Sequence, residues 1–324
     1  MAPAGVVLAT ASVDGGEPRP WLVADGHALP LATWAPDLPF ARVGSLTELV
    51  EHWQDHKAAV HSLTALADTR DRVVSHGEPV ARIRLHPPIR PRQTFCTIGN
   101  YRRQVVQAAL DSADGRSEAA ICEAVDHRRR TGEPYVCLTS PERIRPPFGE
   151  LTIPRDVETL DWEVEIAVVI GGNVRHVTPE NARDGIAGYC VANDLTVRSE
   201  VTRADLPALG SDWVRSKGVP GSLPLGPWFV PAWQIPDVCS LRLRLAVNDT
   251  VMQDDTADDM LFGVEQQIAY LSRHTCLRPA DVICTGSPAG FGSHHGRFLR
   301  DGDRVTAQVS GLGEQHLRCV EESR

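Results

Sequence analysis

The sequence predicts a mainly β protein with some α-helix, an α+β fold, with a small α+β domain over residues 1–85 and a larger domain over residues 86–324. A chain of 324 residues is too long for one small module and too short for three. Three prolines within residues 85–92 remove backbone donors and fix φ, so we place the domain boundary there. Beyond it, short apolar runs outnumber helical segments, without βαβ alternation or internal repeats.

The first domain is expected to combine hairpins with helices. Residues 1–30 alternate short apolar runs with Asp-Gly turn clusters, a pattern typical of hairpins. Residues 45–74 fit a helix or a helix pair, because Ser45 is followed three positions later by Glu48, which matches a capping box.

The second domain is expected to open with a strand at Thr94–Ile98 and a helix at residues 102–112. The polar stretch 113–133 fits a mobile helix or loop that could fold over a site as a lid. From Leu160 onward strands dominate, with one helix at about residues 258–273. The expected strands cover residues 162–170, 188–193, 226–230, 240–247, 281–284 and 303–309.

The composition argues against several classes of protein. A net charge of −9 disfavours nucleic-acid and anionic-membrane surfaces, because both need a basic face. No apolar run approaches the roughly 18 residues of a membrane span, and the first residues carry no basic signal-peptide region, so we expect a soluble, cytoplasmic protein. The eight cysteines include no CxxC pair and mostly lie in apolar runs, which predicts buried free thiols.

The strongest chemical signal is the run that begins at Asp161. Alternation along a strand would put Asp161, Glu163 and Glu165 on one face, with successive side chains about 6–7 Å apart. Three acids beside an apolar core are costly unless a cation neutralises them, and Mg²⁺ prefers carboxylate oxygens. A solvated strand face with scattered acids is the alternative.

Three weaker signals follow along the chain. The apolar run that ends at Asp194 either turns there or supplies a third oxygen ligand, with Arg198 as a counter-charge. Lys217, in a loop rich in Pro and Gly, is either exposed or placed to bind a carboxylate or polarise a carbonyl. Residues 285–287 form either a plain tight turn or a set of N–H groups and hydroxyls that bind an anion.

Eight short motifs, in this order, resemble the fumarylacetoacetate hydrolase family over about residues 88–324. The motifs are Gly99-Asn100-Tyr101, Glu163-x-Glu165, Asn193-Asp194-x-Thr-x-Arg198, Lys217 with Pro224-x-Gly226-Pro227, Val247-Asn248 with Gln253-x-x-Thr256, Thr285-Gly286-Ser287-Pro288-x-Gly290, Gly302-Asp303 and Gly311-Leu-Gly313. The resemblance implies a folded-over, mixed β-roll or β-sandwich catalytic core, usually in a homodimer. It also implies Mg²⁺ or Mn²⁺ held by Glu163, Glu165 and Asp194.

The resemblance implies an activity as well. Family members chelate a 2-oxo or 2,4-dioxo acid on the metal and then cleave a C–C bond hydrolytically, decarboxylate, or isomerise the enol, because the cation stabilises the enolate. Lys217 would be a catalytic residue, and the partner would be a small-molecule acid. The implied substrate contacts are Tyr101, Gln104, Arg198, Gln253, Thr285, Gly286 and Ser287.

The sequence departs from the family pattern where hydrolytic members activate water. Those members usually carry a His three residues after the motif tyrosine and a Glu three residues later. Here Gln104 and Gln107 occupy these positions, and neither amide is a base near neutral pH. A family lysine expected near Thr139 is also missing, and Pro220 stands where an acid often follows the loop lysine.

Three interpretations stay open. In the first, His127 in the polar stretch serves as the base of a C–C hydrolase, although an exposed surface histidine is the simpler account. In the second, the enzyme is a decarboxylase or an enol or double-bond isomerase, which needs no activated water. In the third, a binding or scaffold protein has lost turnover. An unrelated alternative is a sugar-binding β module with Trp162, Trp213 and Trp228 as stacking platforms.

Overall fold

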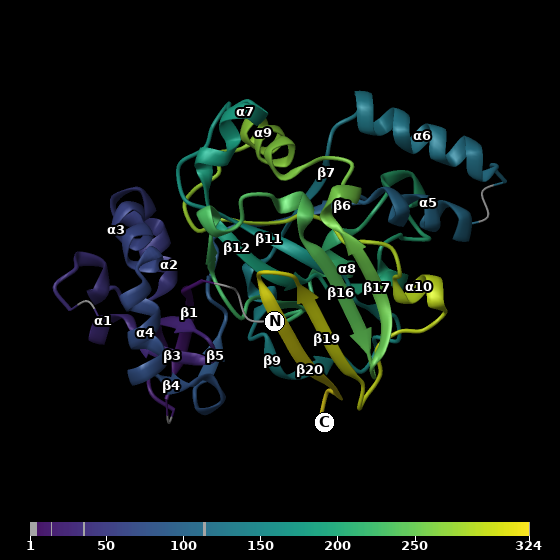
Figure 1. Cartoon of the computed structure of the whole chain (residues 1–324). Coiled ribbons are helices and arrows are strands. Elements are labelled where there is room, and N and C mark those ends of the chain that lie inside the picture. The colour runs from purple at the N-terminus through teal and green to yellow at the C-terminus, as the bar shows by residue number, and fades with distance from the viewer. Residues whose placement is uncertain (1–4, 14, 35, 113–114, 324) are drawn as a thin grey trace.

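The first part of the structure is a five-stranded antiparallel sheet with the expected hairpins (Figure 1). The structure, a computed structural model, describes residues 5–13, 15–34, 36–112 and 115–323. In chain order the strands are β1 Val7–Ser12, β2 Arg19–Ala24, β3 His27–Pro30, β4 Glu78–Pro79 and β5 Arg84–His86. They lie in the order β4-β3-β2-β1-β5, so the last strand of this part returns to pair with the first.

Helices cover this sheet, and three consecutive helices replace the one or two expected over residues 45–74. They are α2 Leu46–Glu51, α3 Trp53–Ala65 and α4 Ala67–His76, preceded by α1 Leu31–Trp34. The Ser45 hydroxyl accepts a hydrogen bond from the Glu48 N–H at 3.1 Å and so caps α2 as predicted. The Glu48 carboxylate accepts from the Gly44 N–H at 2.7 Å instead of that of Ser45, which displaces the capping box by one residue.

The first part packs directly against the rest of the chain. Leu8 of β1 exchanges backbone hydrogen bonds of 3.1 and 2.8 Å with Phe229. The Trp53 ring stacks on Trp233 with the ring centroids 5.6 Å apart and meets Phe229 at an edge. These contacts join the first sheet and its helices to the segment near residue 230.

The second part contains two sheets packed face to face, which confirms the predicted α+β fold. One sheet has the order β15-β12-β11-β18-β6-β7, with β6 Thr94–Ile98, β7 Tyr135–Thr139, β11 Val164–Ile170, β12 Ile186–Asn193, β15 Val230–Pro231 and β18 Val282–Cys284. The other has the order β17-β16-β19-β20-β9, with β9 Phe148–Ile153, β16 Arg242–Val247, β17 Thr250–Thr256, β19 Arg304–Val309 and β20 Gly313–Glu321. Ile166 and Val168 of β11 share one core with Leu243 and Leu245 of β16.

Among the described residues, two short strand pairs and six α-helices complete the second part (Figure 1). The pairs are β8 Ile144–Arg145 with β14 Leu223–Pro224, and β10 Leu160–Asp161 with β13 Thr196–Val197. The helices are α5 Arg102–Asp111, α6 Glu118–Thr131, α7 Pro179–Ala182, α8 Trp213–Lys217, α9 Val264–His274 and α10 Gly292–His295. Within the described ranges, no helix is both long and apolar enough to cross a membrane.

Three expected elements differ in extent from the structure. The strand expected over 162–170 begins only at Val164, as β11, because the Glu163 N–H donates to the Asn193 side chain instead of to a backbone carbonyl of the neighbouring strand. The strand expected over 226–230 shortens to β15, since Pro227 has no N–H to continue a ladder. The helix expected from about residue 258 begins at Val264, where the Gln266 side chain accepts from the Gly263 N–H at 2.8 Å.

Candidate metal centre and substrate site

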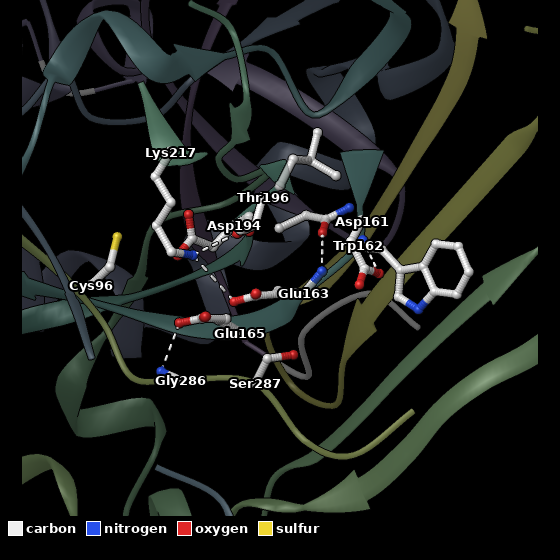
Figure 2. A network of polar contacts seen from close by, with 12 residues as sticks. Cys96, Asp161, Trp162, Glu163, Glu165, Asp194, Thr196, Lys217, Gly286 and Ser287 are labelled. Atoms are coloured by element: carbon white, nitrogen blue, oxygen red, sulfur yellow. Dashed lines mark hydrogen bonds and ion pairs between the residues drawn. The ribbon is translucent and has the colours of Figure 1, made fainter. Parts of the chain in front are cut away.

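Three acidic side chains converge where β11 begins and β12 ends (Figure 2). The two strands pair in register at Val164 and Asn193, so the residues just outside the pair, Glu163 and Asp194, face each other. Glu165 lies two residues along the chain from Glu163 and points to the same side. One carboxylate oxygen from each acid lies within 4.8 Å of the others, and all three residues are buried. This spacing of hard oxygen ligands suits a small divalent cation.

Two basic side chains neutralise part of this negative charge. The Lys217 ammonium, 1% exposed at the end of α8, donates to Asp194 at 2.5 Å and to Glu163 at 3.3 Å. The Arg198 guanidinium donates to Glu163 at 2.6 Å. Glu165 has no ion pair of this kind among the described residues, so its charge is the least compensated of the three.

Asp161 does not join the three acids, and the prediction that it shares their face is wrong. The chain leaves the sheet between β10 and β11, so strand alternation does not run from Asp161 to Glu163. The Asp161 carboxylate accepts from the backbone N–H groups of Gly292 at 2.6 Å and Ser293 at 3.2 Å, and it pairs with Arg198 at 2.7 Å. Asp161 therefore holds Arg198 against the start of α10.

Arg143 is a residue of this cluster that sequence reasoning missed. Its side chain is 0% exposed and donates to Asp194 at 2.6 Å, to the Leu195 carbonyl at 3.0 Å and to Ser222 Oγ at 2.9 Å. Its Nη1 lies 3.4 Å from Thr139 Oγ1, beside the position where the family resemblance implies a lysine. A buried arginine from a nearby turn thus supplies a positive charge in that region.

Burial and mutual charge push the pKa values of the three acids apart. Burial is the largest cause that raises the pKa of Asp194, to about 6. The charge of Glu163 adds to this rise, and the charge of Lys217 opposes it. Burial and the charges of Asp194 and Glu163 raise the pKa of Glu165 well above its usual value. Burial alone would raise the pKa of Glu163 too, but the charges of Lys217 and Arg198 outweigh it and lower that pKa.

These shifts predict that the metal-free protein loses stability as the pH rises. The pKa of Asp194 is about 6 in the folded protein against an ordinary 3.8, so between these values the folded state holds a proton that the unfolded chain has lost. The resulting stabilisation is complete below 3.8 and disappears as the pH rises through about 6. Glu165 extends the loss to higher pH, because its pKa is also raised. Glu163 has a lowered pKa, so the stability that it contributes to the folded protein is lost only as the pH falls below its ordinary 4.5.

Urea unfolding in EDTA, from about pH 5 to about pH 8, measures this effect. The free energy of unfolding is expected to fall across the range, and Glu165→Gln is expected to flatten the fall. A profile that is level or rises in the wild-type protein would contradict the electrostatic account of the cluster.

The loop after β18 forms the other wall of the site. The Gly286 N–H donates to Glu165 at 2.7 Å. The Gln253 amide accepts from the Val164 N–H at 3.1 Å and donates to Ser287 Oγ at 2.9 Å. Gln253, expected as a substrate contact, thus hydrogen-bonds to the protein through both the oxygen and the nitrogen of its amide. It links this loop to β11.

Buried polar atoms without a protein partner gather around Glu165. They are Glu165 Oε1, the Tyr101 hydroxyl and Thr285 Oγ1, none of which has a hydrogen-bond partner among the residues described. Tyr101 lies close enough to Glu165 that, after burial, the charge of this acid helps to raise the pKa of the phenol. Because buried polar groups are almost always satisfied in folded proteins, this set indicates a cation and an oxygen-rich ligand as partners.

The glutamines at the positions of the usual water-activating pair lie on α5. Gln104 is buried, and Gln107 Oε1 accepts from the Gly290 N–H at 2.9 Å, which holds the loop after β18. His127 is exposed on α6, and its ring lies 3.2 Å from Thr131 Oγ1 of the same helix. The structure therefore does not bring His127 to the acids.

The tryptophans of the sugar-binding alternative are not available as open platforms. Trp162 is fully buried, and its indole N–H donates to the Gly290 carbonyl at 3.0 Å. Trp228 is buried as well, and Trp213 bonds to the Tyr135 hydroxyl at 3.1 Å. Stacking on a sugar needs an accessible ring face, so this arrangement disfavours that alternative.

The profile of a known protein family matches most of this chain. The sequence profile of the fumarylacetoacetate (FAA) hydrolase C-terminal domain matches residues 93–320. The chain belongs to the fumarylacetoacetate hydrolase family. The match begins directly after the proline-rich segment and includes all three acids, Lys217 and Arg143, so the site described above lies wholly within the family domain.

Individual relatives support this assignment across both parts of the chain. A Burkholderia lata protein named as a hydrolase is 38% identical over 199 residues, which cover 59% of this chain and 68% of the relative. A structure described as a 2-hydroxyhepta-2,4-diene-1,7-dioate isomerase from Mycobacterium abscessus is 26% identical, with a TM-score of 0.72 over 98% of this chain and 100% of the other. Maleylpyruvate hydrolase from Sphingobium sp. SYK-6, solved with manganese(II) and pyruvate, is 21% identical, with a TM-score of 0.71 over 98% and 100%. Fumarylacetoacetate hydrolase family enzymes thus share this whole fold.

Proposed function

We propose that the chain is a divalent-cation-dependent enzyme that acts on a 2-oxo or 2,4-dioxo acid, or on the corresponding enol. The observation that carries this proposal is the buried Glu165, whose Oε1 has no described partner although two further acids lie within reach. Glu163, Glu165 and Asp194 would hold Mg²⁺ or Mn²⁺, since both prefer carboxylate oxygens. When bound, such a cation draws electron density from a 2-oxo group and stabilises the enolate that forms.

The surrounding residues fit the binding of an acid at this centre. Lys217 lies against Glu163 and Asp194, where its ammonium would attract a substrate carboxylate or an enolate oxygen. The Thr285 and Tyr101 hydroxyls have no hydrogen-bond partner among the residues that the structure describes and would donate to substrate oxygens. Arg198 donates hydrogen bonds to Asp161 and Glu163, and these two bonds hold its positive charge near the site.

We infer that the reaction is proton transfer within the substrate, by enol or double-bond isomerisation or after decarboxylation. Hydrolysis needs a base that activates water, and the amides of Gln104 and Gln107 cannot serve. Within the described part of the chain, no histidine hydrogen-bonds to the three acids. The isomerase relative from M. abscessus, at 26% identity, supports this choice.

C–C bond hydrolysis is a second candidate, and one pair of side chains favours it. His294 of α10 lies 2.9 Å, through Nδ1, from Asp111 at the end of α5. Asp111 follows Gln104 and Gln107 at helical spacing, on the same side of α5 as the missing pair. A histidine oriented by a carboxylate leaves its second nitrogen free to take a proton from water.

Two experiments separate these proposals. Thermal unfolding is measured with EDTA, with Mn²⁺, and with Mn²⁺ plus oxalate, a planar mimic of a 2-oxo-acid enolate. Mn²⁺ alone is expected to raise Tm, and oxalate is expected to raise it further only when Mn²⁺ is present, because each ligand binds only the folded protein. No rise with either addition would remove the basis of the metal-dependent proposal.

The reaction type is then read from product masses. A 2-hydroxy-2,4-dienoate diacid is expected to give a product of unchanged mass, whereas an acylpyruvate is expected to stay intact. Cleavage of the acylpyruvate into two acids, lost in His294→Asn and kept in the neighbouring His295→Asn control, would establish hydrolysis instead. Both histidines lie on α10, so the pair of variants is matched in position.

A further inference from the structure

A row of cysteines crosses the sheet next to the three acids. Cys284 of β18 pairs in register with Cys96 of β6, and Cys96 pairs in register with Cys137 of β7. Residues in register on neighbouring strands point to the same face of the sheet. On β11, the register partner of Cys284 is Ala167, two residues from Glu165, so the thiols lie one row away from the acids on their side of the sheet.

The geometry of this row suits disulfide formation. Directly opposite residues of antiparallel strands have Cα atoms about 4.5–5.5 Å apart, inside the usual disulfide range of about 4.4–6.8 Å. Cys96, Cys137 and Cys284 are all free cysteines. Cys137 lies on the edge strand β7 and is 8% exposed, whereas the other two are fully buried, so Cys137 is nearest to solvent.

Positive charge selects Cys96 as the reactive thiol. Arg143 Nη1 donates to Cys96 Sγ at 3.7 Å, and the Thr139 hydroxyl lies 3.7 Å from the same sulfur. The neighbouring thiols of Cys137 and Cys284, with the charges of Arg143 and Lys217, lower the pKa of Cys96 despite its burial. Figure 2 shows Cys96 on the same side of the acids as Lys217. Thiolates near cationic groups are the form that attacks oxidants.

We infer that Cys96 and Cys137 form a reversible disulfide in response to hydrogen peroxide, and that this modification is coupled to the acid cluster through Arg143. The Cys96 thiolate attacks one peroxide oxygen, the O–O bond breaks, and a sulfenic acid and one water result after proton transfer. The Cys137 thiol then attacks the Cys96 sulfur, the S–S bond forms, and the hydroxyl leaves as a second water. Two thiols are oxidised and one peroxide is reduced, and a dithiol reductant reverses the change.

The coupling follows from the contacts of one guanidinium. Arg143 donates to Cys96 through Nη1 and to Asp194 through Nη2, at 2.6 Å. Drawing the Cys96 sulfur into a bond with Cys137 takes away an acceptor from Arg143 and shifts the group that holds Asp194. This part of the inference rests on the proposed function, because its consequence is weaker binding of the metal, by about tenfold, as when an outer contact of a ligand is changed.

Peptide mapping tests the disulfide in the full-length protein. The native protein is treated with hydrogen peroxide, remaining thiols are blocked, and the chain is digested with trypsin. Trypsin separates Cys96 in peptide 93–102, Cys137 in peptide 131–143 and Cys284 in peptide 274–297. A cross-link of 93–102 with 131–143, absent in Cys137→Ser and retained in Cys239→Ser/Cys276→Ser, is expected. No cross-link, or a cross-link to 274–297 instead, overturns the pairing.

Metal binding tests the coupling separately. Mn²⁺ affinity of the reduced and oxidised protein is measured by the competition of EDTA, and the oxidised protein is expected to bind about tenfold more weakly. The Cys137→Ser variant, treated with peroxide in the same way, is expected to keep the reduced affinity. Equal affinity of both forms of the wild-type protein overturns the coupling. Absence of Mn²⁺ binding by the reduced protein counts instead against the proposed function, and the mapping result still decides on the disulfide.

Discussion

Replacing Arg143 with methionine is expected to lower the free energy of unfolding by about 3–5 kcal/mol, the usual cost of removing one partner of a buried ion pair. The guanidinium is fully buried and is bound to Asp194 at 2.6 Å and to the Leu195 carbonyl and Ser222 hydroxyl. Methionine fills similar volume but donates no hydrogen bond, so an aspartate and a carbonyl lose donors that water cannot replace.

Urea unfolding of Arg143→Met at about pH 7 measures the loss. Arg242→Met is the matched control, because Arg242 also pairs with an aspartate, Asp254, through two hydrogen bonds, but at the exposed surface. Little or no change is expected in the control, since exposed ion pairs contribute little. Arg143→Lys is expected to lie between the two, as it keeps the charge and loses the planar fork of donors. Equal stabilities of Arg143→Met and the control would show that the buried pair does not hold the site together.

The loss should also depend on pH in a defined direction. With the arginine gone, burial raises the pKa of Asp194 further, because a major positive partner is missing. Lowering the pH then protonates this carboxyl and removes the uncompensated charge. The difference between wild type and Arg143→Met is therefore expected to shrink as the pH falls toward about 6 and to level off below it, where both proteins hold this proton.

Arg143 also shows which parts of the site could be predicted from sequence. The alternation of Glu163 and Glu165 is a local pattern, and an apolar run ending at Asp194 is another, so both can be recognised without a fold. The pairing of Arg143 with Asp194 joins residues 51 positions apart, and only the tertiary arrangement of β8 and β14 creates it. Nothing in the neighbourhood of Arg143 in the sequence distinguishes it from the other arginines of the chain.

The same distinction applies to the fold. Hairpins, the cap at Ser45 and the main strands follow from turn residues and apolar periodicity, which act over a few residues. The break between β10 and β11 does not, because it depends on the Asn193 side chain, whose oxygen takes the place of a backbone carbonyl of β12 as the acceptor of the Glu163 N–H. Local alternation therefore predicts that Asp161 lies with the acids, whereas in the structure its carboxylate binds the start of α10.

Two single substitutions in the acid cluster are expected to weaken metal binding to a similar extent. They are expected to change the stability of the metal-free protein in opposite directions. Glu163→Gln and Glu165→Gln each remove one of the three carboxylates, so each should weaken Mn²⁺ binding by more than about 100-fold, beyond the usual loss from changes outside the ligands themselves. Their effects without metal differ because their partners differ. Glu163 is paired with Arg198 and Lys217, while Glu165 accepts one hydrogen bond, from the Gly286 N–H.

Without metal, Glu163→Gln takes a counter-charge from the buried Lys217 and the partly buried Arg198, and is expected to lower the free energy of unfolding by about 3 kcal/mol. Glu165→Gln keeps an oxygen for the Gly286 N–H and turns an amide donor toward the carboxylates of Glu163 and Asp194. It also removes a like charge, so the free energy of unfolding at about pH 8 should rise by roughly 1 kcal/mol. Urea unfolding in EDTA, with Mn²⁺ titrations of the same samples, measures both quantities.

The opposite signs make this pair of variants a strict test. A simple packing effect would change the stability of both proteins alike, because in each a glutamine replaces a buried glutamate of nearly equal volume. A general loss of charge would stabilise both, because the cluster contains three acids within 4.8 Å. Glu163 is bound by cations, whereas Glu165 has no such partner among the described residues. Only this difference predicts a loss of stability in the first variant and a gain of stability in the second. Two losses, or retained Mn²⁺ affinity in either variant, would therefore reject the three-acid site as described.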